Sequence, residues 1–246
     1  IRAFDESANV DMNNNGFSRI TCFDCQQRKQ SEWSILSDDE YALLNEVKVC
    51  RQYSQKQIIF SEGERCQGVY CVESGLVGVR KVAPDGDSVL VRLAFPGETL
   101  GYRPCLAEEP HRGMGEALEN SIICFIESSV VRHLINRNPA LGLKFLKRAA
   151  QSMGDAEEKY FENVTLDVRT RFSHLLAVLM NRYGKTNGGG EMLFEMPLSR
   201  QDLAALIGTR PESLSRIIKT MEEDGIVSFA GRKVCIPEKE LLLNEL

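Results

Sequence analysis

Eight cysteines are the residues of this 246-residue chain with the most obvious chemical potential. They stand at positions 22, 25, 50, 66, 71, 105, 124 and 235, and only Cys22 and Cys25 form a C-x-x-C pair. Thiolates bind soft metals, and paired thiols exchange with disulfides. The scattered spacing does not resemble a small disulfide-rich domain. It indicates free, metal-binding or redox-sensing thiols in a reducing cytoplasm, which is the location we expect.

A second set of candidate functional residues lies between Ser199 and Lys233, in the stretch SRQDLAALIGTRPESLSRIIKTMEEDGIVSFAGRK. Ser199 can cap a helix that Gly208 ends, and a second helix is expected to begin near Pro211. Two short helices joined by a tight turn are typical of a helix-turn-helix. The second helix directs outward side chains that can bind base edges and phosphates, namely Glu212, Ser213, Ser215, Arg216 and Lys219.

The residues after Gly225 predict two short strands around the turn Ala230-Gly231-Arg232-Lys233, which would form a basic wing. The chain has a net charge of −5, so it is not coated in positive charge. A helix-turn-helix needs only a local basic face to bind DNA. From Ser199 to Met221 four basic residues stand against two acids, which makes this stretch locally positive. The alternative is an ordinary helical hairpin with a solvated face.

The elements that must position these residues follow a clear order. Residues 1 to about 20 are polar and Asn-rich and predict a flexible arm. Short apolar segments separated by turn residues then predict an antiparallel β-barrel or jelly roll, with strands at Gln57–Phe60, Val69–Val72, Val77–Val82, Val89–Phe95 and Ile122–Ile126. The fold class is α+β, and the expected domains are an arm and cysteine loop (1–36), a sensor barrel (37–138), a dimerisation helix (139–165) and a winged helix-turn-helix (166–246).

A long helix is expected to begin at Pro139. Its apolar and small residues step alternately by four and three positions, which is the spacing of a coiled-coil seam; the seam residues are Leu146, Ala149, Met153, Ala156 and Tyr160. The alternative is a helix packed against its own barrel. Because helix-turn-helix domains usually bind two half-sites as a symmetric dimer, the pattern favours a homodimer.

Barrel, long helix, helix-turn-helix and wing, in that order, resemble the Crp/Fnr family of bacterial transcription regulators. The motifs that carry the resemblance are SEGERCQGVYCVESGLVGV in the barrel and GTRPESLSRIIKTMEEDGIV at the second helix. The resemblance implies a dimer that binds double-stranded DNA and works with RNA polymerase. It also implies a set of side chains that contact DNA phosphates and fix the position of the protein along the duplex. These are Ser199, Arg200, Ser213, Lys219, Arg232 and Lys233.

The resemblance assigns base-reading roles to three residues of the second helix. Glu212 and Arg216 stand at the positions that contact a G·C pair in each half-site, and Ser215 matches the Fnr branch. A guanidinium can bind guanine O6 and N7, and a carboxylate can accept a hydrogen bond from cytosine N4. Pro211 stands where the Crp branch has an arginine. The expected target is therefore an Fnr-like palindrome of the type TTGAT-N4-ATCAA.

The signal that such a regulator would sense is less clear from the sequence. The resemblance places an Fnr-type 4Fe–4S cluster on Cys22, Cys25 and Cys124, but Ser31 or Ser34 occupies the place of the remaining cysteine ligand. Several alternatives stay open. The remaining cluster ligand could be a non-cysteine residue (Asp24, Glu32 or a serine) or a substitute such as Cys50 or Cys105. The cysteines could instead form a dithiol switch or a zinc site, or the sensor could have lost its ligand. The cyclic-nucleotide positions of the Crp branch fall on Tyr102 and Arg112-Gly113, of which only the arginine matches, so a cyclic nucleotide is not expected.

Other function classes fit the sequence poorly. A cupin-type barrel enzyme needs several metal-binding histidines, yet His111 is the single histidine between Val49 and Glu127. None of the three histidines, namely His111, His133 and His174, lies in a haem-ligand motif, and no nucleophile–base pair stands out. The chain has no run of eighteen apolar residues and no secretion signal, so we expect a non-membrane regulator rather than an enzyme.

Overall fold

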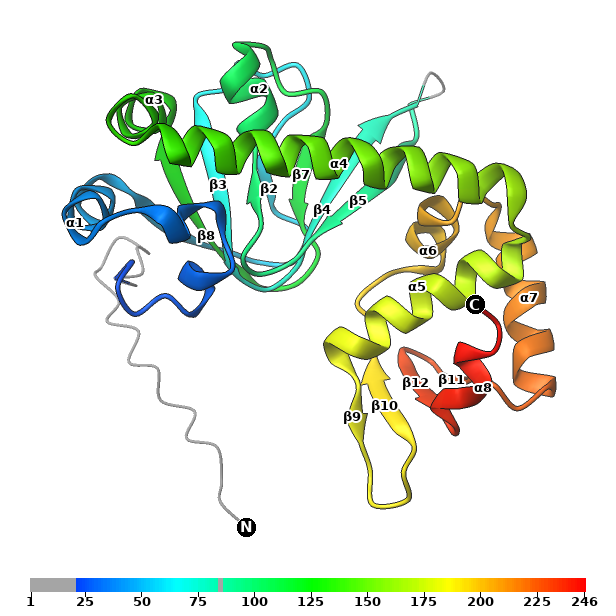
Figure 1. The fold of residues 1–246 in the computed structure, drawn as a ribbon. Helices are drawn as coiled ribbons and strands as arrows, with labels where there is room; N and C mark the ends of the chain where they lie inside the picture. The colour runs from blue at the N-terminus through cyan, green and yellow to red at the C-terminus, as the bar shows by residue number, and fades with distance from the viewer. Residues whose placement is uncertain (1–20, 84–85) are drawn as a thin grey trace. The chain divides into compact units, whose positions relative to one another are not determined.

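The computed structural model describes residues 21–83 and 86–246 (Figure 1), so the predicted arm at residues 1–20 lies outside the described residues. The first elements are Gln26–Lys29 (η1), Glu32–Ile35 (η2), Asp38–Val47 (α1), Val49–Tyr53 (β1), Ile58–Phe60 (β2), Gly68–Ser74 (β3), Val77–Val82 (β4), Ser88–Ala94 (β5) and Thr99–Leu100 (β6). Next come Tyr102–Ala107 (α2), Met114–Ala117 (β7), Ser121–Glu127 (β8), Ser128–Arg137 (α3) and Pro139–Thr165 (α4). The remaining elements are Val168–Tyr183 (α5), Lys185–Thr186 (β9), Met192–Glu195 (β10), Arg200–Leu206 (α6), Pro211–Glu223 (α7), Ser228–Ala230 (β11), Lys233–Ile236 (β12) and Lys239–Leu243 (α8).

These elements form two compact units. The N-terminal unit comprises Ile1–Ser88 and Arg92–Gln151, and the C-terminal unit comprises Val89–Val91 and Ser152–Leu246, so that helix α4 contributes to both. The N-terminal unit contains the predicted β-structure as two four-stranded sheets, ordered β1-β8-β3-β6 and β2-β7-β4-β5. Apolar side chains from both sheets meet between them, among them Phe60, Val72, Val77, Leu100 and Ile123. The architecture is therefore the expected α+β fold.

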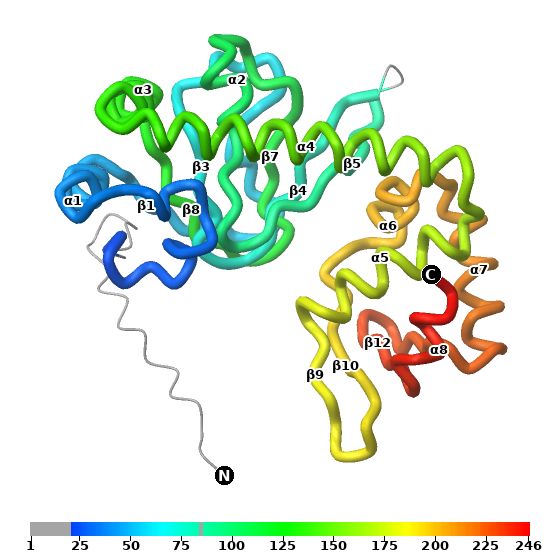
Figure 2. The backbone as a smooth tube through the Cα atoms, viewed as in Figure 1, coloured from blue at the N-terminus to red at the C-terminus, as the bar shows by residue number. Residues whose placement is uncertain are grey.

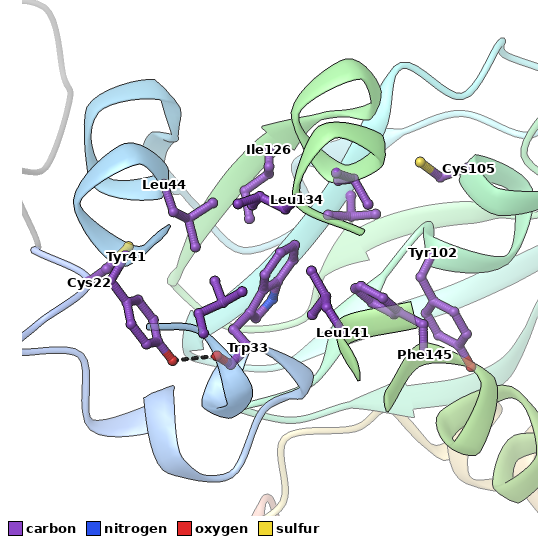
Figure 3. Close-up of a cluster of buried hydrophobic side chains, with 13 residues drawn as sticks. Cys22, Trp33, Tyr41, Leu44, Tyr102, Cys105, Ile126, Leu134, Leu141 and Phe145 are labelled. Carbon is purple, nitrogen blue, oxygen red and sulfur yellow. Dashed lines mark hydrogen bonds between the residues drawn. The ribbon is translucent and has the colours of Figure 1, made fainter. Parts of the chain in front are cut away.

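The outer face of the β1-β8-β3 sheet carries a second core. Because alternate side chains of a strand point to opposite faces, Ile126 of β8 lies on the face opposite to Ile123. Helices α1, α3 and the start of α4 cover this face, with Trp33, Leu134, Leu141 and Phe145 in contact (Figure 3). We call this set of buried residues the helical core. It joins the cysteine loop to the beginning of the long helix.

Local sequence signals explain where several helices begin. Ser37 accepts a hydrogen bond from the Glu40 backbone N–H, and the Glu40 carboxylate accepts one from the Ser37 backbone N–H, which forms a capping box at α1. The same Ser37 N–H is the main reason that the pKa of Glu40 lies below its usual value. Ser199 caps α6 by accepting from the Asp202 N–H, and Pro211 occupies the first turn of α7. The helix starts predicted at Ser199 and Pro211 are confirmed.

The C-terminal unit is a winged helix-turn-helix. Helices α6 and α7 lie in the chain between strands β9 and β10 and strands β11 and β12, and these four strands form one sheet ordered β11-β12-β10-β9. Figure 2 traces the backbone from β9 and β10 through α6 to α7. Strands β11 and β12 pair antiparallel in the register Ala230 to Lys233, with Gly231 at a φ of +66° in the turn between them. The wing predicted from Ala230-Gly231-Arg232-Lys233 is confirmed.

Gly208 ends α6 with a φ of +65°, a conformation that side chains bearing a Cβ adopt at a cost of about 1–2 kcal/mol. A Cβ at this position would lie 2.9 Å from Oδ1 of the exposed Asn163, whose amide can rotate away. We therefore expect Gly208→Ala to lower the free energy of unfolding by about 1–2 kcal/mol through backbone strain. Urea unfolding of the full chain measures this loss.

The matched control for that substitution is Gly188→Ala, because Gly188 has no positive φ and no atom within 4 Å of an added Cβ. It should leave the free energy of unfolding within about 0.5 kcal/mol of the parent. Equal losses at both glycines would contradict the conformational account of the turn between α6 and α7.

Candidate functional site

Helix α7 separates an apolar face from a polar one. Its residues Leu214, Ile218 and Met221 are buried against the C-terminal unit. The opposite face exposes Glu212, Ser215, Arg216 and Lys219 to solvent. Lys219 lies 3.8 Å from Glu223 one turn later, whereas Glu212 and Arg216 hold no ion pair within residues 21–83 and 86–246. Both side chains are thus exposed and available to an external partner.

The two serines of α7 differ in their surroundings. Ser215 is exposed, and its hydroxyl donates to the Pro211 carbonyl at 2.9 Å, so its oxygen lone pairs still face outward as acceptors. Ser213 is half-buried. Of the two, Ser215 is therefore the one that can accept a hydrogen bond from a bound molecule.

Arg200, which we expect to contact phosphate, has an aromatic partner on the wing. Its guanidinium stands 4.2 Å from the centroid of the Phe229 ring on the wing, which is a cation–π distance. Burial lowers the pKa of Arg200 below its usual value. Ser199 also uses its hydroxyl internally, donating to Asp202 at 2.8 Å. Arg200 thus joins the start of α6 to the wing, whereas Ser199 caps α6 itself.

The wing is fastened on both sides. Arg232 donates from Nε to the Met196 carbonyl at 2.9 Å, and the Phe229 N–H donates to Glu222 at 2.8 Å. Lys233 is exposed. The wing therefore has a fixed position against α7 and directs a basic side chain to solvent.

Arg169 of α5 fixes the end of α7. It pairs with Asp224 at 2.6 Å and with Glu245 at 2.6 Å. The hydrogen bonds that Arg169 donates to Glu245 and Asp224 raise the pKa of Arg169. Such charge-assisted bonds are among the stronger polar contacts in proteins. They tie the last turn of α7 to both α5 and the C-terminal residues.

The second candidate site is a cavity in the N-terminal unit lined by cysteines. Its walls include Cys22, Cys25, Cys71 and Cys124, together with Ser31. The three thiols predicted from the sequence, and the serine at the place of the missing ligand, are thus brought to one cavity. Cys71 was not predicted. The available signal was the alternation in GVYCVES, because it places Cys71 on the same face of the strand as Val69 and on the face opposite to Val72.

Cys124 is covalently bonded inside this site. It forms a disulfide with Cys50, directly opposite on the neighbouring strand β1. Cys71 faces Cys124 from the other side, on β3, so three cysteines form a row across β1, β8 and β3. The Trp33 indole N–H donates to the Cys71 sulfur at 3.1 Å. This cysteine row (Cys50, Cys124 and Cys71) therefore lies directly beneath the cysteine loop.

Two of the free cysteines that line the cavity, Cys25 and Cys71, are held in their protonated form by burial. Burial raises the pKa of Cys25, and burial raises the pKa of Cys71 to about 12. Cluster iron binds thiolates, and the sulfur of Cys124 is already bonded to Cys50. Among the residues that the structure describes, no group of three His, Cys, Asp or Glu side chains is placed to hold a metal ion. This arrangement does not fit an iron–sulfur cluster.

Contacts connect the cysteine loop to α4. The Trp33 ring meets Phe145 edge to face with centroids 5.4 Å apart. Arg148 of α4 binds Glu98 at 2.7 Å and lies 3.7 Å from the buried carboxylate of Glu32. Glu32 in turn accepts a hydrogen bond from Thr99 at 2.8 Å. A change at the thiols thus has a direct packing route to the long helix.

The predicted seam of α4 is exposed in the single chain. Leu146, Met153 and Tyr160 are 64%, 65% and 74% exposed. Ala156 is also exposed, whereas Ala149 is half-buried and packs against the helical core. Large apolar side chains in a row on one helix face are typical of an interaction surface.

The nucleotide positions of the Crp branch hold other contacts in this chain. Tyr102 is buried and stacks on Phe145 with centroids 6.0 Å apart. Arg112 is exposed and pairs with Glu109 at 2.6 Å. His174 is half-buried, with Nδ1 3.2 Å from Glu162. No helix of residues 21–83 or 86–246 has the length and hydropathy needed to cross a membrane.

Comparison with known proteins identifies both units. The family described as "Cyclic nucleotide-binding domain" matches residues 50–138, and "Crp-like helix-turn-helix domain" matches residues 170–245. The chain is 23% identical to the "Transcriptional activator protein FnrL" of Cereibacter sphaeroides, over 91% of each chain. It is also 23% identical to the "Anaerobic regulatory protein" of Bacillus subtilis, over 89% of this chain and 92% of that one.

A solved structure with the same fold is FixK2 from Bradyrhizobium japonicum, with a TM-score of 0.69 and 23% identity over 80% of this chain and 96% of that chain. The order of the two matched domains, the exposed face of α7 and the similarity to transcription regulators along nearly the whole chain agree with one another. The chain is a DNA-binding transcription regulator of the Crp/Fnr family, not an enzyme.

Proposed function

We propose that this chain works as a homodimer that binds a TTGAT-N4-ATCAA palindrome and that its DNA affinity depends on the thiols of the N-terminal unit. The observation that carries the proposal is the exposed face of α7, on which Glu212 and Arg216 are free and Ser215 presents an acceptor. A guanidinium and a carboxylate one helical turn apart suit the two bases of a G·C pair. By family, RNA polymerase is the expected protein partner.

A competition titration tests the proposed target sequence. One fluorescent duplex carries the TTGAT palindrome, and unlabelled competitors carry either the same box or a GTGA-type box. Each mismatched base pair typically costs about 1–3 kcal/mol, so the GTGA competitor should need roughly a tenfold higher concentration or more for each mismatched half-site. Equal competition by both duplexes would contradict the proposed preference for a TTGAT-type half-site.

The exposed seam of α4 supports the homodimer. We expect Met153→Lys to raise the dimer dissociation constant at least about tenfold, because burying one methionine contributes about 1.5–3 kcal/mol. Sedimentation velocity measures the change. Gln151→Lys, an equal change of charge at an exposed position outside the seam, is the control and should leave the dimer intact. A dimer unaffected by Met153→Lys would show that another surface joins the chains.

The thiol part of the proposal rests on the cysteine row and its contacts. Reduction would break the Cys50–Cys124 disulfide that joins β1 to β8 beneath the cysteine loop. The contact between Trp33 and Phe145 would then transmit the resulting change to α4. Anaerobic purification followed by iron and sulfide analysis and thiol titration distinguishes the alternatives. If the protein contained iron and sulfide in equal amounts, the sensor would be a cluster and not the disulfide. Calorimetric titration with cyclic nucleotides tests the remaining alternative, a ligand in the barrel.

A further inference from the structure

The wing lies at the edge of the C-terminal sheet and needs support beyond its backbone pairing. Strand β11 spans only Ser228–Ala230 and stands last in the order β11-β12-β10-β9, so its one neighbour among the described strands is β12. Its only large apolar side chain is Phe229, which is half-buried between the exposed residues Ser228 and Ala230. Because alternate side chains of a strand point to opposite faces, Phe229 is the side chain of β11 that can hold the strand against the rest of the unit.

The partner of the Phe229 ring is the first residue of α6. The Arg200 guanidinium carbon lies 4.2 Å from the centroid of this ring, which is within the range of a cation–π contact. The Nη1 atom of Arg200 is buried and has no hydrogen-bond partner among the residues that the structure describes. A group with five N–H donors thus lies over a ring, with one of its nitrogens shielded from solvent and unpaired.

Helix α7 holds the same wing residue through its backbone. The Glu222 carboxylate accepts a hydrogen bond from the Phe229 N–H at 2.8 Å. Burial lowers the pKa of Arg200, and the negative charge of Glu222 acts in the opposite direction. The Phe229 position is therefore the point at which α6, α7 and the wing meet.

We propose that Arg200 is a positioning residue for DNA binding, which supports the Phe229 ring and thereby fixes the wing so that Lys233 meets the DNA backbone. Lys233 is exposed and pairs with Ala230, the residue next to Phe229. To donate from Nη1 to a phosphate, the Arg200 guanidinium would have to leave the ring, because that nitrogen is shielded where it lies. The inference rests on DNA binding by the C-terminal unit and does not require the TTGAT palindrome.

Arg200→Met separates support of the ring from charge. Methionine is unbranched, and its sulfur contacts aromatic rings with an energy similar to that of an exposed cation–π contact, but it carries no charge. Fluorescence anisotropy measures the affinity for a duplex at several salt concentrations. We expect Arg200→Met to keep the dissociation constant within about twofold of the parent and to leave its salt dependence unchanged. Arg200→Ala should raise the dissociation constant roughly fivefold for each bound chain, because the ring then loses its support.

The salt dependence identifies the alternative role, a direct phosphate contact. Each phosphate that a protein neutralises contributes about 0.9 to the slope of log K against log salt concentration. If Arg200 bound phosphate, Arg200→Met and Arg200→Ala would weaken binding equally, and each would reduce this slope by about 0.9 for each bound chain. That result would overturn the proposal.

A second measurement follows Lys233 directly. Lys233→Ala should weaken DNA binding in the parent, but by a smaller factor in Arg200→Ala, where the wing no longer holds the lysine at the backbone. Lys219→Ala on α7 is the matched control and should cost the same factor in both proteins. Phe229→Ala should reproduce the effect of Arg200→Ala, and the two together should weaken binding no further than either alone. An equal cost of Lys233→Ala with and without Arg200 would show that Arg200 does not position the wing.

These measurements use the full chain, and thermal unfolding establishes that each variant is folded. Should Arg200→Ala not fold, the salt slope of Arg200→Met decides between the two roles by itself. A scrambled duplex of equal length gives the same comparison, because phosphate contacts carry no sequence information. If the parent does not prefer the TTGAT palindrome, the proposed target fails, whereas the role of Arg200 is still decided on the scrambled duplex.

Discussion

Arg216→Ala is expected to weaken binding to the cognate palindrome by about 1–3 kcal/mol, which corresponds to roughly 5- to 150-fold in dissociation constant. Arg216 is exposed on α7 and is free of ion pairs in the described part of the chain, so the substitution removes a base contact without breaking an internal one. The loss should be confined to specific DNA. Fluorescence anisotropy with the palindrome and with a scrambled duplex of equal length measures both affinities.

Lys219→Ala is the matched control for that prediction. Lys219 is exposed on the same helix and is expected to contact phosphate, so its loss should weaken both duplexes about equally and reduce the salt dependence of binding by about one ion. If Arg216→Ala lowered the affinity for both duplexes to the same extent, Arg216 would be a phosphate contact. If it changed neither, the assignment of α7 as the reading helix would be wrong.

Phe145→Ala is expected to have the largest effect on stability. Phe145 of α4 is fully buried in the helical core, where it meets Trp33 edge to face and stacks on Tyr102. Truncating a buried phenylalanine typically costs about 3–5 kcal/mol, because the cavity collapses only partly. Urea unfolding followed by the fluorescence of Trp33, the only tryptophan in the chain, reports on this core.

Leu143→Ala serves as the control for Phe145→Ala. Leu143 lies on the same helix but is 67% exposed, so its truncation should change the free energy of unfolding by no more than about 0.5 kcal/mol. A loss below about 1 kcal/mol for Phe145→Ala would contradict the packing route from the cysteine loop to α4.

The winged helix-turn-helix was predictable because its signals are local. The Ser199 cap, the positive φ of Gly208 and the Pro211 helix start each depend on a few neighbouring residues, and each is confirmed. The barrel strands that alternate strongly were also found, with Val77–Val82 matching to the residue. Strand β1 was missed, as were the short elements without a periodic pattern, namely β6, α2, β7, β9 and α8.

The thiol sites show what the sequence alone could not supply. Cys50 and Cys124 are 74 residues apart, and only the register of β1 against β8 makes them partners. The sequence presents Arg200 as an exposed basic residue, but the wing places the Phe229 ring 4.2 Å from its guanidinium. Long-range pairing decides both arrangements, and a local pattern carries no information about it.

The most direct test of the account is a DNA titration of the full chain in two thiol states. Anisotropy with the TTGAT palindrome is measured once on fully reduced protein and once with the Cys50–Cys124 disulfide formed, alongside Cys50→Ser, which cannot form that bond. The account predicts that the two states of the parent differ at least about tenfold in dissociation constant, or about 1.4 kcal/mol, and that Cys50→Ser gives one value under both treatments. Equal affinity of the reduced and oxidised parent for the palindrome would contradict thiol control of DNA binding.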